Sequence, residues 1–351
     1  MTAAVLQEIP KSPGVWTEAW RRLKNDRAGM IALVITAFFV GLVALAQLGV
    51  VAKNWQAEVG TAYAPPHFIG KIVDGSQTAV VETVKGANSD ISAIDPLAPR
   101  YAEWAERASK FSTTETVKTD TLPFGGDRLG RDVLSKAIKG AEVSIFVGLA
   151  AALVATFIGT LLGAIAGYFG GKVGDFLEWV YNVFTSIPYI LLVFALAAVL
   201  KAGPLANKFD GVWTVVIILS AVGWTGIYRL VRAEYMKHRN REYVRAAEAI
   251  GASHASRMFT HILPNVSHVV LVQLSLHVVS FIKAEVILSF LGLGVPVDMV
   301  SWGTMLSEAQ TELVQGKWWQ LVAATAFMAT FVTAFALLTD ALRDALDPKL
   351  R

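Results

Sequence analysis

The chain has 351 residues, of which 54% are hydrophobic and 17% are charged, and its formal net charge is +3. Because a soluble domain carries about 25% charged residues, this composition indicates a membrane protein. The small net charge gives no reason to expect a nucleic-acid partner. The chain contains no cysteine, which excludes disulfides, cysteine-bound zinc and a thiol nucleophile.

Six stretches without Asp, Glu, Lys or Arg are long enough to cross a bilayer core of about 30 Å as helices. We therefore predict an all-α membrane protein with six transmembrane helices. Their expected bounds are about 28–52, 143–169, 177–200, 211–230, 264–290 and 318–341. The first stretch lacks a signal-peptide cleavage pattern, so we expect it to remain as a membrane anchor.

Lysine and arginine accumulate beside particular span ends, and this bias predicts the orientation in the membrane. The residues before the first span include Arg21, Arg22, Lys24 and Arg27. We therefore expect the segment 1–27 in the cytoplasm, and six crossings return the C-terminus to the same side. The basic loop 231–263 is expected there too, whereas the insert 53–121 is expected outside the membrane.

The parts outside the membrane have patterns of their own. Residues 16–24 fit an amphipathic helix on the membrane surface, and a solvated basic leader explains them equally well. In the insert, residues 67–84 predict a two-stranded hairpin and residues 99–111 predict a short helix that starts after Pro99. An insert of this length is typical of a functional subdomain or of disorder, and we expect a small ordered subdomain.

Two spans carry features of membrane-helix packing. In the second, Ala155, Gly159, Gly163 and Gly167 are spaced by four, which lets helix backbones approach closely in lipid. In the third, Pro188 predicts a kink. Kinked helices are frequent along transport paths, although proline is also common in membrane helices generally. Pro188 is therefore one of three residues that we assign to a translocation path.

The other two residues are Lys283 and Glu285, which lie inside the fifth span. Ionisable residues within a membrane segment are costly and normally face a cavity or a partner. Because they are two positions apart, these two do not share a helix face. Snorkelling from the outer end of the helix is an equally good explanation, so both hypotheses stay open.

The chain has no motif for chemistry of its own. The phosphate-binding pattern G-x-x-x-x-G-K-[ST] is missing, since Ala166 stands in place of its first glycine and Val173 in place of its last residue. Histidines between 254 and 268 lack the spacing of helical zinc ligands, and no G-x-S-x-G elbow occurs. We expect no catalytic residue, no metal site and no cofactor bound by this chain.

One cytoplasmic stretch, EYVRAAEAIGASHASRMFTHILPN from Glu242 to Asn265, is polar and contains two short helical patterns. On a helix over 242–250, one face is apolar and is formed by Tyr243, Ala246, Ala247 and Ile250. The opposite face carries Arg241, Arg245 and Glu248. These patterns fit equally well a helix that docks into a groove of a partner and a helix that lies on the membrane.

The end of this helix is marked by Gly251, since glycine enters the left-handed conformation of a helix cap without strain. A second short helix is expected over 255–262. Pro264 then suits the first turn of the fifth span, where its missing N–H costs nothing. The sequence therefore predicts an elbow, residues 242–264, made of two short helices between the fourth and fifth spans.

The elbow resembles the E-A-A-x-x-x-G…L-P loop of the permease subunits of ABC importers. The matching residues are Arg245, Ala246, Ala247, Gly251, Leu263 and Pro264. Further stretches resemble the dipeptide/oligopeptide group, in particular its second (C-type) subunit, and they are 124–149, 284–306 and 338–351. The resemblance covers about residues 95–351, and no known pattern matches the insert over 53–88.

This resemblance implies the type I ABC importer permease fold, with a permease core over 122–351, in a bacterial inner membrane. It implies a translocation subunit that is not an enzyme, and it implies four kinds of partner: a second permease in a heterodimer, two ATPases that bind ATP and Mg, an extracytoplasmic substrate-binding protein and the lipid bilayer. It also implies that the elbow docks on an ATPase. The docking residues would be Glu242, Tyr243, Arg245, Ala246, Ala247, Glu248, Gly251, Leu263 and Pro264.

One position departs from the family's loop, because Arg245 stands where glutamate is usual. The acidic residue of the family faces the ATPase and pairs with a basic group there, which an arginine would repel at short range. Three explanations stay open: a different contact on the ATPase, a side chain in solvent, or an ion pair with Glu248.

Three alternatives accompany this reading. Peptides are the expected cargo, but related permeases carry nickel complexes, glutathione or oligosaccharides. A proton-coupled secondary transporter that uses Lys283 and Glu285 is an alternative of another class, although no inverted repeat supports it. A membrane-bound scaffold whose working part is the insert 53–121 is a third.

Overall fold

The computed structural model describes residues 15–70, 96–109, 118–202, 211–296 and 298–346. Within these ranges pairing between extended segments is limited to isolated β-bridges, and the all-helical expectation is confirmed. The chain divides into two compact units, Met1–Lys53 with Ser135–Arg351, and Asn54–Leu134. The hairpin expected over 67–84 lies mostly outside the described residues.

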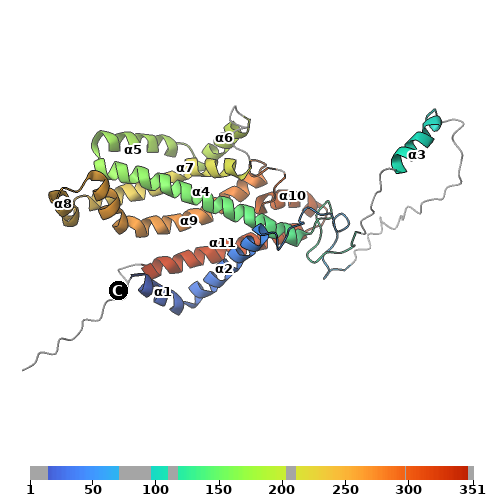
Figure 1. Ribbon diagram of the computed structural model, residues 1–351, viewed down its shortest axis with the longest axis horizontal. Helices are drawn as coiled ribbons and strands as arrows, with labels where there is room; N and C mark the ends of the chain where they lie inside the picture. The colour runs from blue at the N-terminus through green and yellow to red at the C-terminus, as the bar shows by residue number, and fades with distance from the viewer. Residues whose placement is uncertain (1–14, 71–95, 110–117, 203–210, 297, 347–351) are drawn as a thin grey trace, which may run out of the picture. The chain divides into compact units, whose positions relative to one another are not determined.

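Five helices are long and apolar enough to cross a membrane, and the bent pair α5 and α6 raises the number to as many as six (Figure 1). The five are α2 (Arg27–Gln47), α4 (Val133–Phe169), α7 (Val212–His238), α9 (Leu263–Phe290) and α11 (Trp319–Leu346). The largest difference from the expected bounds is in α4, which begins at Val133 rather than near 143. A search for charge-free stretches misses its first turns because they contain Lys136, which is buried in an ion pair.

The third expected span, 177–200, is not a single helix. It is divided into α5 (Gly171–Thr185) and α6 (Tyr189–Ala202), which are bent by 88° relative to each other. Pro188 lies in the break, so the predicted kink is a complete interruption. Proline lacks an amide donor and disfavours helical backbone at the residue before it, and the hydrogen-bond ladder therefore ends there.

The small residues of α4 pack against α7, as their spacing predicts. A Cβ atom on Gly159 would lie 2.5 Å from the Trp224 carbonyl oxygen, and one on Gly167 would lie 2.5 Å from the Arg232 carbonyl oxygen. Ala155 is fully buried in the same helix. These close backbone approaches give α4 and α7 a fixed register. The elbow follows the C-terminal end of α7.

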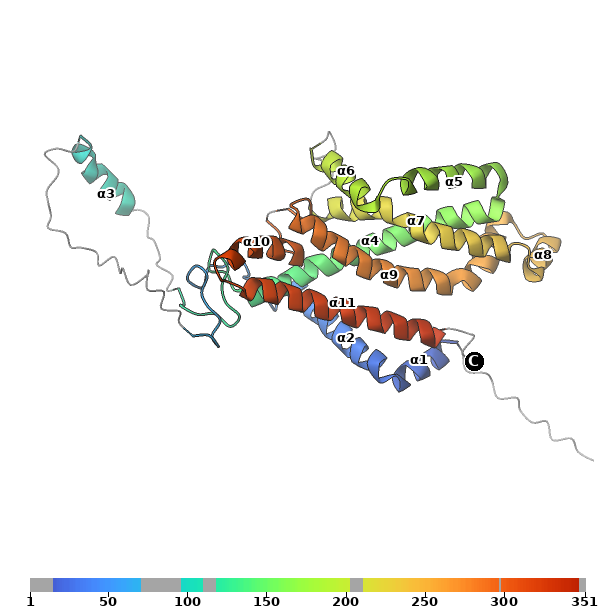
Figure 2. The ribbon, with the colours of Figure 1, turned by 180° about the vertical axis from the view of Figure 1, so that it is seen from behind.

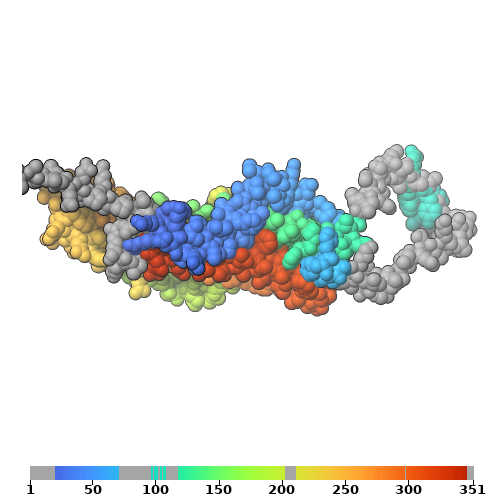
Figure 3. Space-filling model, turned by 90° about the horizontal axis from the view of Figure 1, so that it is seen from below, coloured from blue at the N-terminus to red at the C-terminus, as the bar shows by residue number. Residues whose placement is uncertain are grey.

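The N-terminal segment packs on the last helix. The helix α1 (Val15–Asn25) stands where an amphipathic helix is expected, and Asp26 caps α2 by accepting a hydrogen bond from the Ala28 amide (3.0 Å). Leu23 is buried among residues of α2 and α11. Figure 3 shows α1 and α2 (blue) lying beside α11 (red) on one face of the unit.

The smaller unit, Asn54–Leu134, extends beyond the expected insert boundary at 121. Its helix α3 (Tyr101–Ser109) follows the 3-10 turn η2 (Ala98–Arg100) and confirms the short helix expected after Pro99. The ordered subdomain expected over the whole insert stays a prediction, because residues 71–95 and 110–117 lie outside the described ranges.

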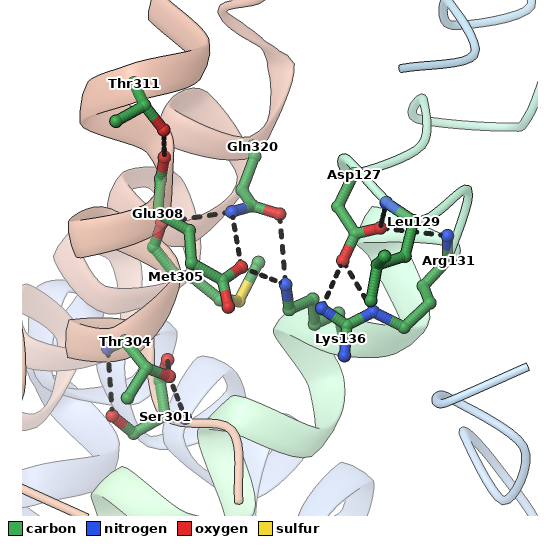
Figure 4. A network of polar contacts seen from close by, with 10 residues as sticks. All are labelled: Asp127, Leu129, Arg131, Lys136, Ser301, Thr304, Met305, Glu308, Thr311 and Gln320. Carbon is green, nitrogen blue, oxygen red and sulfur yellow. Dashed lines mark hydrogen bonds and ion pairs between the residues drawn. The ribbon is translucent and has the colours of Figure 1, made fainter. Parts of the chain in front are cut away.

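A buried aspartate organises the C-terminal part of this smaller unit. Asp127 is fully buried, and its Oδ1 accepts hydrogen bonds from the amides of Leu129 (2.9 Å) and Arg131 (3.0 Å) (Figure 4). Its Oδ2 pairs with the Arg131 guanidinium (2.6 Å), which also lies over the Trp55 ring. A charged side chain held in this way fixes the turn that precedes α4.

Candidate functional site

The cytoplasmic loop that contains the elbow is shorter and more continuous than its sequence predicts. Because α7 runs to His238, the loop expected over 231–263 loses its first turns to that helix. The helix α8 (Glu242–Ala249) follows, and a π-helical segment, η3 (Ser256–Ile262), continues directly into α9. In Figures 1 and 2, α8 lies at one end of the larger unit and α10 (Trp302–Val314) at the other.

The second short helix of the elbow is present over Ser256–Ile262, close to its expected bounds, but it is not separated from the fifth span. Pro264 lies in the first turn of α9, but helical backbone precedes it. A proline inside a helix removes one donor and crowds the carbonyl four residues earlier. The wider turns of a π segment relieve such an irregularity and let one rod continue from Ser256 to Phe290.

Gly251 closes α8 in the geometry that its sequence position predicts. Its φ is +86°, in the left-handed region. The Gly251 amide donates to the Glu248 carbonyl (2.9 Å) and the Ala252 amide to the Ala247 carbonyl (2.9 Å), which together form a Schellman cap. The chain thus turns sharply at a residue with no side chain to restrain it.

The predicted apolar face of α8 is split in two. Ala247 is buried together with Val244, which the sequence pattern missed, and Val244 packs in a cluster with Tyr235 of α7 and Met258 of η3. The other three members of the predicted face are exposed, and we call them the exposed stripe: Tyr243, Ala246 and Ile250. Ile250 leaves 84% of its surface open. The helix is therefore seated on its own bundle by one edge and presents a second apolar edge outward.

Arg245 does not pair with Glu248. The Glu248 carboxylate instead pairs with Arg257 (2.6 Å), on the far side of Gly251. Arg245 is exposed and makes no ion pair with any residue that the structure describes. Of the three explanations for this arginine, the pair with Glu248 is excluded.

The remaining docking residues lie around the same end of the bundle. The Tyr243 hydroxyl lies 2.8 Å from Nδ1 of His238, and partial burial raises the pKa of Tyr243, against the opposing effects of Arg241 and a hydrogen bond with Asn265. Glu242 and Pro264 are exposed, whereas Leu263 is partly buried against the cluster below α8.

The three residues assigned to a translocation path do not come together. Glu285 has no exposed surface, and its Oε1 accepts a hydrogen bond from Ser289 (2.6 Å). Lys283 is exposed on another face of α9, and Pro188 is exposed at the bend between α5 and α6. Close packing of Gly303 of α10 on Ser289 covers the part of α9 that carries Glu285, and the assignment of these residues to a path stays a prediction.

A second polar cluster, at the α10 end, has no counterpart in the sequence analysis. Lys136 of α4 is 1% exposed, pairs with Glu308 of α10, and donates to the Gln320 Oε1 of α11 (3.3 Å) (Figure 4). Gln320 donates in turn to the carbonyl of Met305 (3.2 Å) and to Glu308 (3.1 Å). Glu308 and Gln320 lie 172 and 184 positions from Lys136, so no local pattern could reveal this cluster.

Across the described ranges, no three His, Asp or Glu side chains gather in a way that would hold a metal ion. The larger unit is a set of membrane-length helices with a short helix between two of them that presents an apolar edge. This combination defines a multi-span membrane protein with an exposed apolar edge on a short helix between two of its spans.

Comparison with known proteins gives the family. The family described as "Binding-protein-dependent transport system inner membrane component" matches residues 159–351, and "N-terminal TM domain of oligopeptide transport permease C" matches residues 14–66. The chain belongs to the family of binding-protein-dependent transport system inner membrane components. The expected fold class, the type I ABC importer permease, is thereby confirmed.

Several curated relatives are similar over most of the chain. The oligopeptide transport system permease protein OppC of Bacillus subtilis is 37% identical over 69% of this chain and 78% of its own. The dipeptide permease protein DppC of the same organism is 39% identical over 65% and 69%. DppC of Lactococcus lactis is 28% identical over 95% and 90%. Among solved structures, the inward-facing MetNI methionine ABC transporter has a TM-score of 0.48 at 14% identity and covers 60% of this chain and 96% of its own.

Proposed function

We propose that this chain is a membrane-spanning subunit of an ATP-driven importer of peptides or peptide-like solutes. It forms half of the translocation path and couples to an ATPase through the elbow, residues 242–264. The single observation that carries the proposal is the family match over residues 159–351, which includes the whole elbow. Relatives named as oligopeptide and dipeptide permeases support peptides as the cargo.

The exposed stripe supports docking rather than a membrane-surface role. A helix lying on the bilayer would combine a broad apolar face with basic flanks. The exposed apolar surface of α8 consists of three residues. The most exposed of them, Ile250, is the C-cap residue and directly precedes Gly251. A narrow apolar edge on a short, firmly seated helix suits a groove on a partner protein.

The proposed mechanism is alternating access. ATP and Mg bind to two ATPase subunits, whose closure moves α8 on the cytoplasmic side. Because η3 and α9 form one rod, a displacement of the elbow is transmitted along α9 without an intervening loop. A second permease subunit completes the path in a heterodimer, and the chain termini lie in the cytoplasm. No bond of the cargo is broken by this chain.

An extracytoplasmic binding protein would deliver the cargo on the opposite side of the membrane. The unit Asn54–Leu134 precedes α4 in the chain and is expected on that side, where it is available to receive such a protein. Proton coupling through Lys283 and Glu285 receives no support, because the two side chains lie on different faces of α9 and only Lys283 is exposed.

The proposal is tested by reconstituting the chain in proteoliposomes with the second permease, the ATPases and the binding protein encoded beside it. We expect uptake of a labelled peptide. This uptake requires ATP on the side of the membrane where the ATPases lie and the binding protein on the opposite side. A panel of peptides, glutathione, an oligosaccharide and a nickel complex identifies the cargo class. Uptake driven by a pH gradient without ATP would contradict the proposal.

A further inference from the structure

We propose that Arg257 is a positioning residue that fixes the angle of α8 against the end of α4, so that movement of α8 reaches α4 as well as α9. This inference rests on the proposed coupling function of the elbow. It adds a specific residue and a second route of transmission that the elbow's sequence pattern does not include.

The guanidinium of Arg257 joins three segments of the chain. Its Nη1 lies 2.6 Å from Oε1 of Glu248 in α8. Its Nη2 donates to Nδ1 of His254 (2.9 Å), in the turn between α8 and η3. The same group lies over the ring of Tyr168, 5.8 Å from its centroid, in the last turn of α4. Planar delocalised charge suits this combination of fork-like hydrogen bonding and stacking, which a lysine does not reproduce.

A second polar contact to α4 shares the same ring nitrogen of His254. The Tyr168 hydroxyl lies 2.9 Å from the same His254 Nδ1. The carbonyl of Tyr168 accepts from Arg239 (3.3 Å), which follows α7. The last turn of α4 is thus tied to the elbow through Arg257 and His254, and to the end of α7 through Arg239.

The ion pair spans the turn of the elbow at Gly251, which the Schellman cap and the packing of Val244 with Met258 also cross. Glu248 lies before Gly251 and Arg257 lies after it. At Gly251 a Cβ atom would meet no atom within 4 Å, so the surroundings do not restrain the backbone there. A hinge of this kind transmits force only if a contact across it fixes its angle. Among the described ion pairs, Glu248–Arg257 is the one that crosses this hinge.

Burial argues that this arginine is retained for position rather than for stability. Its side chain is 10% exposed, whereas Glu248 is 63% exposed, so the charge that has lost its water is that of Arg257. Its Nε has no hydrogen-bond partner among the described residues. Burying a charge so incompletely satisfied is costly, and an apolar side chain beside Met258 and Ile262 would pack at lower cost.

The proposal separates ATPase binding from transport. The exposed stripe and Arg245 are residues other than Arg257, so a variant without the guanidinium keeps Tyr243, Ala246, Ile250 and Arg245, while the exposed Glu248 loses its ion-pair partner. With this contact to α4 removed, ATPase closure would move α8 with less displacement of α4. Hydrolysis then continues while transport per ATP falls.

The test compares Arg257→Met with the wild-type complex and with Lys172→Met, an exposed cation near the same end of the bundle. For Arg257→Met we expect the ATPases to co-purify as in the wild type and peptide uptake per ATP hydrolysed to fall about tenfold, the loss of one charge-assisted hydrogen bond. Lys172→Met should leave the ratio unchanged. Arg257→Lys and Tyr168→Phe, which disturb the protein less, should give intermediate losses.

A distance measurement reads the hinge directly. Because the chain has no cysteine, spin labels on Ala249→Cys in α8 and Asp175→Cys in α5 report the position of α8, with partner subunits that also lack cysteine. Arg257→Met should broaden the distance distribution. The proposal would be overturned if the distance distribution and the peptide uptake per ATP were both unchanged in Arg257→Met, Arg257→Lys and Tyr168→Phe. A wild-type complex that shows no ATP-driven uptake would instead contradict the proposed function.

Discussion

Two short helices, α8 and α10, stand at opposite ends of the same helical unit, and they are held in opposite ways (Figure 2). α8 is seated by two apolar residues, Val244 and Ala247, and by one ion pair between Glu248 and the buried Arg257, and its outer edge is exposed. α10 is bound to α4 and α11 through the buried Lys136, and its Trp302 indole donates to the Ala137 carbonyl (3.1 Å). We infer from this difference that a partner contacts and moves α8, whereas α10 keeps its position.

The start of α10 shows the same fixity. Ser301 and Thr304 form a reciprocal capping box, with the Thr304 amide donating to Ser301 Oγ (3.2 Å) and the Ser301 amide to Thr304 Oγ1 (2.8 Å) (Figure 4). α8 has no side-chain cap at its start. Because both helices end in a glycine with positive φ, paired substitutions at the two sites compare them directly.

The largest effect is expected at the α10 end. Glu308→Ala leaves the buried ammonium of Lys136 without its carboxylate, and removal of one partner from a buried pair costs about 3 kcal/mol of unfolding free energy. Thermal or denaturant unfolding in detergent measures this loss. The double variant Lys136→Met with Glu308→Leu removes both charges and should recover most of the stability. A single variant as stable as the double one would show that the pair does not hold α10.

The next effect is expected at the two capping glycines. Gly251→Ala and Gly316→Ala each force a side chain into the left-handed region, and each should cost about 1–2 kcal/mol of local stability. Only Gly251→Ala should also lower ATPase association and peptide uptake, since Gly316 ends α10. Gly251→Pro, whose φ is fixed near −65°, should abolish uptake. Equal loss of coupling at both glycines, or normal uptake by Gly251→Pro, would remove the distinction between the two helices.

A smaller effect is expected at two exposed apolar tips. Ile250 beside the α8 cap and Val314 at the end of α10 are 84% and 89% exposed. Replacement of either by serine should change unfolding free energy by no more than about 0.5 kcal/mol, because neither is packed. Ile250→Ser should weaken ATPase binding about tenfold, as expected for an apolar anchor in a groove. Val314→Ser is the matched control and should leave that affinity unchanged.

The smallest effect is expected at Arg245. Its exposed guanidinium has no ion-pair partner among the described residues, so Arg245→Glu should alter ATPase affinity by about 1 kcal/mol or less at physiological salt. Titration of binding against ionic strength measures it, and the change should shrink as salt screens the contact. An affinity that does not respond to this reversal at any salt concentration would place Arg245 outside the interface.

Local patterns in the sequence were sufficient for some of this structure. Charge-free stretches locate the spans, the spacing of Gly159, Gly163 and Gly167 predicts the close approach that α4 makes to α7, and Gly251 predicts the cap of α8. Each of these depends on residues within a few turns of one another, where periodicity and backbone preference are decisive.

The features that the sequence did not predict depend on distant contacts. The burial of Glu285 follows from α10, a helix without a membrane-length apolar run. The ion pair of Glu248 with Arg257, rather than with Arg245, depends on how the chain turns after Gly251. The π segment was expected as a separate helix. Sequence patterns do not distinguish a helix that ends before Pro264 from one that continues past it through a wider, π-helical turn.

The central claim is that α8 is the element that an ATPase grips, and site-specific crosslinking tests it most directly. Because the chain has no cysteine, single cysteines at Ile250 and at Val314 can carry a short photoreactive crosslinker in the assembled, transporting complex. We predict a crosslink from position 250 to an ATPase subunit, with a yield that changes when ATP is hydrolysed, and none from position 314. A complex that imports peptide while position 250 never crosslinks to an ATPase would contradict the account.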